Sequence, residues 1–219
     1  TAERFALRDM SLDLRWPDYD GAATFAASAT LEDQPVDIAG QLERVGNFID
    51  GGVSDIQVTV SASGGTVSFA GQAGVQPQLG GHLSADLENT AAFLAVFGVS
   101  GVDIPDGLGR ALSLSGDLSL TQDLRVSLRD TTVGLDQNRL TGAADVHLGG
   151  AKPRVNAQLN ADALDFSALA ASSGGDSGGG TGGGSVPSDG WSKAPIDASA
   201  LALADAEVAL VADSVDLGD

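Results

Sequence analysis

The sequence predicts an all-β protein: an elongated, curved antiparallel β-sheet that forms an open groove or a half-barrel and carries one or two short helices. Apolar and polar residues alternate with a period of two along most of the chain, which gives each strand one apolar and one polar face. Turn-forming pairs such as Gly64-Gly65 and Gly149-Gly150 separate these stretches every eight to twelve residues. Long stretches with helical periodicity are missing, so helices are not expected to cover the sheet.

The predicted strands follow one another through residues 1–171, which we take as a single repeating β region. Because short turns separate them, neighbouring strands are expected to pair as antiparallel hairpins. The alternating apolar positions are Leu12/Leu14/Trp16, Phe25/Ala27/Ala29/Leu31, Ile56/Val58/Val60/Ala62, Val67/Phe69, Leu83/Ala85/Leu87, Leu112/Leu114/Leu118/Leu120, Leu124/Val126/Leu128, Val133/Leu135, Val146/Leu148 and Val155/Ala157/Leu159/Ala161.

One segment within this region, near residues 90–98, is predicted to be helical. The stretch "NTAAFLAVFG" offers Asn89 or Thr90 as N-cap, a run of apolar residues, and Gly98 as the C-terminal stop. A second, weaker helical turn is expected in "DFSALAAS", residues 165–172.

Residues 172–190 consist almost entirely of Gly, Ser, Thr, Pro and Asp, and this composition predicts a flexible linker. Residues 191–219 resume the alternation, for example at Val208/Leu210, and therefore predict a further, truncated β segment. Thr1 is not preceded by a Met or a signal peptide, and the last residues form no terminal cap. Both ends are expected to be cuts through a longer protein.

The charge and the cysteine content exclude several classes of partner. The chain carries 30 acidic and 11 basic residues, a formal net charge of -19, and such a field repels nucleic acid and anionic lipid headgroups. It contains no Cys, so disulfides and thiolate metal sites are excluded. No nucleic-acid partner, metal or cofactor is expected.

The string "GDSGG" around Ser177 resembles the nucleophile segment of chymotrypsin-like proteases. A serine needs a base to remove its proton, and the only histidines are His82 and His147, neither of which has a protease-like context. An oxyanion hole needs rigid amide donors, which a glycine run does not provide. We therefore interpret the motif as an accident of the linker, and we predict no catalytic residue and no enzyme activity.

Four pieces of the sequence, in this order and spacing, resemble the AsmA family of Gram-negative bacterial proteins. Together they span roughly Thr90 to Ala212, and each piece alone is degenerate. They are the short helix ending in Phe97-Gly98 before Ile104-Pro105, the strand "LSGDLSL" from Leu114, the block "NRLTGAADVHLGGAKPRVNAQLNADALD" from Asn138, and Trp191-Ser192 with Pro195-Ile196-Asp197.

This resemblance implies a periplasmic protein that an N-terminal helix anchors in the inner membrane, the anchor being part of a longer parent and absent from this chain. The family is similar to bridge-like lipid-transfer proteins, whose curved sheets form a groove lined with apolar side chains. The implied partners are phospholipid acyl chains. The implied function is a contribution to lipid transport between the inner and outer membranes and to outer-membrane assembly.

If the sheet curls without closing, acyl chains can occupy its apolar face and slide along it, because no residue specific for a headgroup is present. The alternative is a structural or adhesin-like β module whose apolar residues pack a closed core without a ligand, and alternation alone does not separate the two. The candidate lipid-contacting residues are Leu112, Leu114, Leu118, Leu120, Val126, Leu128, Val133, Leu135, Val146, Leu148, Val155 and Leu159.

Overall fold

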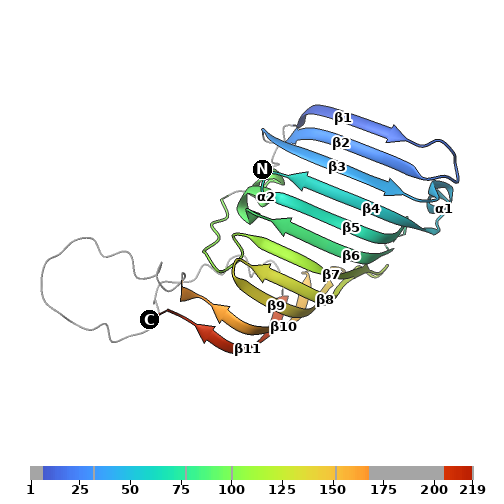
Figure 1. Cartoon of the computed structure of the whole chain (residues 1–219). Coiled ribbons are helices and arrows are strands. Elements are labelled where there is room, and N and C mark those ends of the chain that lie inside the picture. The colour runs from blue at the N-terminus through green and yellow to red at the C-terminus, as the bar shows by residue number, and fades with distance from the viewer. Residues whose placement is uncertain are drawn as a thin grey trace, which may run out of the picture.

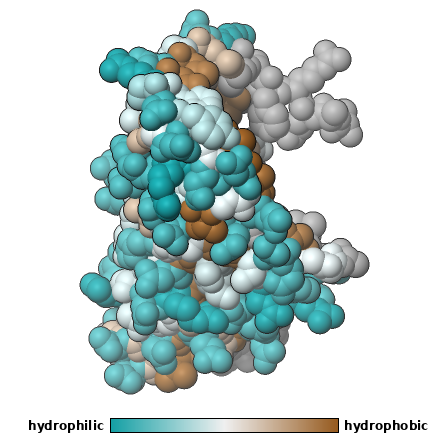
Figure 2. All heavy atoms as spheres, turned by 90° about the vertical axis from the view of Figure 1, so that its right-hand side faces the viewer, coloured by the Kyte–Doolittle hydropathy of each residue, from teal (hydrophilic) through white to brown (hydrophobic). Residues whose placement is uncertain are grey.

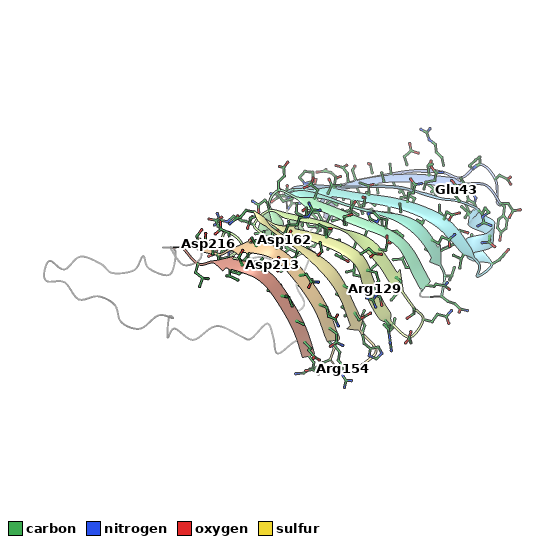
Figure 3. All side chains as sticks on the ribbon, turned by 60° about the horizontal axis from the view of Figure 1, so that its bottom comes forward. Glu43, Arg129, Arg154, Asp162, Asp213 and Asp216 are labelled. Carbon is green, nitrogen blue, oxygen red and sulfur yellow. The ribbon has the colours of Figure 1, made fainter. Side chains whose placement is uncertain are left out.

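The computed structural model describes residues 7–31, 33–76, 78–99, 101–150, 152–167 and 205–218. These residues form one 11-stranded sheet in which the strands lie side by side in chain order, from β1 to β11 (Figure 1). The sheet is curved (Figure 3), and within the described residues neither β1 nor β11 has a partner on its outer side. The prediction of an all-β, curved and open sheet with short helices is therefore confirmed.

Two short helices interrupt the series of strands. The elements are β1 (Leu7–Arg15), β2 (Ala23–Leu31), β3 (Gln34–Leu42), α1 (Val45–Ile49), β4 (Val53–Ala62), β5 (Gly65–Gly74), β6 (Gln78–Leu87), α2 (Thr90–Val96), β7 (Leu112–Leu120), β8 (Arg125–Leu135), β9 (Asn138–His147), β10 (Arg154–Asp165) and β11 (Asp205–Asp216). We call the end of the strands at which α1 joins β3 to β4 the α1 end, and the opposite end, at which α2 follows β6, the α2 end.

The first ten strands pair antiparallel, as expected, whereas β11 pairs parallel to β10. A parallel neighbour cannot be reached through a hairpin, because the chain must first return along the whole length of the strand. Residues 166–204 make this connection. The predicted linker, with Ser177, and the segment around Trp191 lie outside the described residues, as does most of the predicted helical turn at 165–172.

The predicted helix is α2, and its cap follows from local chemistry. The Oδ1 atom of Asn89 accepts a hydrogen bond from the backbone N–H of Ala92 at 2.9 Å, which satisfies one of the free donors of the first turn. Helix α1 was not predicted. It is only five residues long, and its N-cap is Arg44 in a left-handed conformation (φ 45°), so neither periodicity nor a capping side chain marks it in the sequence.

Strand β8 contains a β-bulge that explains a change of phase in the sequence. The apolar residues fall on even numbers up to Leu128 and on odd numbers from Val133 onward. The pairing registers of β8 with both neighbours shift at this point, and Asp130 has a positive φ of 47°. The extra residue of a bulge restores the face on which the later side chains lie. The two apolar stretches predicted around Leu128 and Val133 are thus parts of one strand.

The buried apolar side chains lie toward the two ends of the strands, whereas the buried Thr131 lies at the bulge in the middle of β8. Helix α1 buries Val45 at the α1 end, and α2 buries Phe93 and Val96 at the α2 end. A further cluster at the α2 end of the last strands consists of Leu140, Ala161 and Leu164. The core is therefore divided into patches that flank the centre of the sheet.

Candidate functional site: an apolar face across eleven strands

The register brings the apolar side chains of successive strands onto one face of the sheet. Cross-strand partners point to the same side, so a chain of partners defines a row that runs across the strands. One such row crosses β1 to β9 and consists of Leu12, Ala27, Ile38, Val60, Val67, Ala85, Leu114, Val133 and Leu140. A second crosses β2 to β11 and consists of Ala23, Leu42, Ile56, Gly71, Gly81, Leu118, Leu128, Ala144, Ala157 and Val208.

We call these two rows, together with the apolar residues between them, the central band. The second row joins ten strands, so at about 4.8 Å between neighbouring strands it extends roughly 43 Å. Seen along the strands from the α1 end, polar side chains cover the left-hand side and the lower right of the molecule, and apolar ones emerge as patches between them, mainly in the centre and toward the upper right (Figure 2).

The central band is only half-buried. Val60, Leu114 and Leu118 are typical members, and each keeps part of its side chain accessible. All described strands belong to the one sheet, and the two described helices lie at strand ends, so in this part of the chain no second layer of regular structure covers the band. An aliphatic surface of this length is one that other apolar groups can occupy.

Eleven of the twelve candidate lipid-contacting residues lie on this face. All eleven are half-buried. Most are cross-strand partners of one another: Leu112 of Leu135, Leu114 of Val133, Leu120 of Val126, Val126 of Val146, and Val146 of Val155. Leu118 pairs with Leu128, and Leu159 lies two residues beyond Ala157 on the same strand. The same face continues through β2 to β6, where Ile38, Val58 and Phe69 carry it. The alternation marks these residues equally well, but they precede the block that resembles the AsmA family, which contains all twelve candidates.

Leu148 does not belong to the apolar face. It follows the last residue of β9, lies in the turn before β10, and is 45% exposed. Alternation continues from Val146 to Leu148 in the sequence, but the strand stops at His147 because Gly149-Gly150 begins the turn. Leu124 likewise lies outside its predicted strand, in the turn before β8, and is 40% exposed.

The loop that follows α2 is fastened to the α2 end of the sheet by Asp136. Its carboxylate accepts hydrogen bonds from the backbone N–H groups of Gly107, Gly109, Arg110 and Ala111, at 2.7, 3.0, 3.2 and 2.7 Å. Burial alone would raise the pKa of Asp136, but the four donors together outweigh it, and its pKa lies below the ordinary value for aspartate. The loop is thereby held beside the buried patch at this end.

The Asn138 side chain forms a second group of hydrogen bonds beside the Asp136 carboxylate. The Asn138 side chain is 2% exposed. Its Nδ2 atom donates to the carbonyl oxygens of Gly107 and Asp165, both at 2.9 Å, and its Oδ1 atom accepts from the backbone N–H of Asp165 at 2.7 Å. These bonds tie the end of β10 to the loop after α2, so the α2 end of the apolar face is closed by hydrogen bonds as well as by packing.

The apolar residues of the two edge strands are the most exposed on this face. Leu12 and Leu14 of β1 are 68% and 58% exposed, and Val208 and Leu210 of β11 are 57% and 47% exposed. In the part of the chain that the structure describes, each edge strand has a neighbouring strand on one side only, so its side chains are covered from one side. The apolar face thus reaches both edges of the sheet without a polar border.

The polar face carries a Ser–His–Asp cluster that sequence spacing did not indicate. His82 on β6 lies opposite Asp117 on β7, with 3.1 Å between Nδ1 and Oδ1, and its Nε2 atom lies 3.0 Å from the Ser115 hydroxyl. Acyl transfer also requires preorganised oxyanion donors and exclusion of water. The side chains of His82 and Asp117 are 54% and 63% exposed on an open strand surface, so this geometry gives no basis for a catalytic assignment.

A hollow of about 580 Å³ lies on the same polar face over β8 to β11. Arg129 and Asp145 line it and form a two-pronged ion pair, with N–O distances of 2.7 and 3.0 Å. The Ser127 hydroxyl and the Arg129 guanidinium hold the pKa of Asp145 below its ordinary value. Because charged and amide side chains line this hollow, it favours water over an acyl chain.

Within the described residues, no group of three or more His, Cys, Asp or Glu side chains is arranged to hold a metal ion. None of the helices in this part of the chain is long and apolar enough to cross a membrane. No protein-family model, no curated protein and no solved structure matches this chain.

Proposed function

We propose that this chain is a periplasmic module that holds phospholipid acyl chains along its apolar face and contributes to lipid transport between the inner and outer membranes and to outer-membrane assembly. The resemblance of its sequence to the AsmA family motivates this proposal. The observation that carries it is the continuous, half-buried central band, which crosses the sheet without an interruption by charge. In the full-length protein, an N-terminal helix would anchor the module in the inner membrane.

The dimensions of the band suit an acyl chain. The hydrocarbon core of a bilayer is about 30 Å thick, so the tails of one leaflet extend about 15 Å, well below the roughly 43 Å of the longer row. Each buried CH₂ group contributes about 0.8 kcal/mol, so a tail of about fourteen carbons would gain on the order of 10 kcal/mol. More than one tail would fit end to end along the band.

The composition of the band favours movement along it. Its members are aliphatic or Gly over nearly its whole length, so a tail meets a similar surface at every strand. Apolar contact is not directional, so no position holds a tail much more tightly than the next. The open sheet also weighs against a structural module with a closed, ligand-free core, which would need cover from outside the described residues.

The test compares two adjacent positions that point to opposite faces of β4. Val60 lies in the central band and Thr59 lies on the polar face. Each is replaced in turn by the photoreactive amino acid p-benzoylphenylalanine, and the protein is irradiated after expression in the periplasm of a Gram-negative host. We expect phospholipid adducts at position 60 and not at position 59, detected by mass spectrometry.

A second pair of variants tests the same idea without a large side chain. Val60→Asp places a charge in the band and should reduce the phospholipid that co-purifies with the protein, whereas Thr59→Asp should leave it unchanged. Adducts of equal yield at both positions, or protein that carries no lipid at all, would contradict the proposal.

A further inference from the structure

Basic side chains gather at the α1 end of β8, β9 and β10. In the pairing register, Arg125 lies beside His147 and His147 lies beside Arg154, so the three side chains form a row across three strands. Lys152 lies in the turn that precedes β10. The whole chain has only 11 Lys and Arg against 30 acidic residues, so such a group is exceptional on its surface.

A hollow of about 310 Å³ lies over this row, and Arg125, His147 and Arg154 line it together with Asp145, Val146 and Asn156. Neighbouring carboxylates neutralise only part of the positive charge. Arg125 lies 3.7 Å from Asp123, and Asp145 is engaged by Arg129. Asp205 is the register partner of Arg154, but within the described residues neither Arg154 nor Lys152 forms an ion pair.

Two exposed leucines lie in the turns that carry these basic residues. Leu124 precedes Arg125 and Leu148 follows His147, and they are 40% and 45% exposed. The backbone N–H of Leu148 donates to the carbonyl of Leu124 at 3.0 Å, so the two turns are fixed side by side. We call these leucines and the four basic residues the rim patch, which comprises Leu124, Arg125, His147, Leu148, Lys152 and Arg154.

We infer that the rim patch docks on the headgroup layer of a phospholipid bilayer and is the place where lipid enters the apolar face. Exposed leucines flanked by basic residues combine apolar insertion with attraction to lipid phosphates. Arg125, His147 and Arg154 point to the polar face, and at the same strand ends Leu120, Val126, Val146 and Val155 begin the apolar face on the other side of the sheet. This inference rests on the proposed function, because it names the point at which that function meets the membrane.

The charge at the opposite end of the last strands supports one orientation. Arg154 lies at the α1 end of β10, whereas Asp162, Asp213 and Asp216 lie at the α2 end of β10 and β11 (Figure 3). Asp205 and Glu207 also lie at the α1 end of β11, but only the α2 end of these two strands lacks a basic residue, so an anionic bilayer repels the α2 end more strongly. The net charge of -19 does not prevent docking, because carboxylates farther than about 10 Å from the contact are largely screened at physiological ionic strength.

The test is flotation of the full chain with vesicles of phosphatidylcholine alone or mixed with phosphatidylglycerol. The double variant R125Q/R154Q should bind the mixed vesicles about 25-fold more weakly than the unchanged chain, roughly fivefold for each lost charge. The matched control is R8Q/R15Q on β1, which removes the same charge from two exposed arginines far from the patch along the sheet and should bind normally. L124S/L148S should weaken binding to both kinds of vesicle.

The inference is overturned if R125Q/R154Q and the β1 control lose vesicle binding equally. It is also overturned if the unchanged chain does not bind the mixed vesicles. Photocrosslinking at position 60 separates it from the proposed function. With lipid offered in detergent micelles, the rim variants should still yield lipid adducts, whereas with lipid offered in bilayers they should not. If no lipid adduct forms at position 60 with lipid from either micelles or bilayers, lipid binding by the apolar face is itself refuted.

Discussion

At the scale of single residues, Asp136 fastens the loop that closes one end of the apolar face. Its carboxylate binds four backbone N–H groups of the loop after α2, and Asp136→Ala leaves these donors without their partner. We expect the free energy of unfolding to fall by about 2 kcal/mol, measured by urea denaturation at neutral pH. Asp130→Ala is the matched control, because Asp130 also has a positive φ but its carboxylate accepts no hydrogen bond within the described residues.

The effect of Asp136→Ala should depend on pH in a direction that its pKa fixes. The pKa of Asp136 is lower in the folded protein than in the unfolded chain, where it is about 3.9. Its contribution to stability is therefore fully present above the unfolded value and is lost as the pH falls through the folded value. The difference between Asp136→Ala and the unchanged chain should shrink in acid. A difference that stays constant from neutral pH to strong acid would show that the carboxylate charge is not involved.

At the scale of strands, β5 and β6 approach each other closely where Gly71 faces Gly81. A Cβ atom on Gly81 would lie 2.4 Å from the Cα atom of Gly71 and from the carbonyl oxygen of Ala70, so a side chain there must push the strands apart. Gly81→Ala should lower the free energy of unfolding by about 1–3 kcal/mol, measured by thermal or urea denaturation. Gly80→Ala, one residue away, should be tolerated because a Cβ there meets nothing within 4 Å. Equal effects at both positions would mean that strand spacing is not the cause.

Alternation predicted most of the elements, and each difference has a local physical cause. Apolar residues at every second position predicted the strands because one face of each strand is apolar along its whole length, and the Asn89 cap helped to predict α2. Helix α1 lacks a capping side chain, and the bulge at Asp130 changes the face of the chain without a Gly or Pro to mark it. The parallel pairing of β11 depends on how residues 166–204 connect it to β10, and alternation within a strand does not fix the direction in which that strand pairs.

The site was predictable only where it depends on a single strand. The apolar face follows from the alternation of each strand, so the candidates from Leu112 to Leu159 lie together on it, except Leu148 beyond the strand end. The rim patch could not be predicted, because Arg125, His147 and Arg154 become neighbours only through the register of three strands. Sequence spacing contains no information on such a cross-strand row until the turns are known.

At the scale of the whole molecule, an open apolar face and a high net charge act against each other. A net charge of -19 makes copies of the chain repel one another, while the exposed edge strands and the central band favour association. Salt weakens only the repulsion, because the Debye length falls from about 30 Å at 0.01 M to about 3 Å at 1 M ionic strength. We therefore expect the lipid-free chain to be monomeric at low salt and to associate as salt is raised.

Sedimentation velocity over this range of salt measures the effect, and a bound lipid or detergent supplies the control. If the central band drives association, occupying it with a short-chain phospholipid should keep the protein monomeric at high salt, because the apolar surface is then already covered. Val60→Asp should act in the same direction, since it places a charge in the middle of the surface that would be buried. Association that proceeds equally with and without bound lipid would point to the strand edges, since within the described residues β1 and β11 each pair on one side only, whether or not a tail lies on the face.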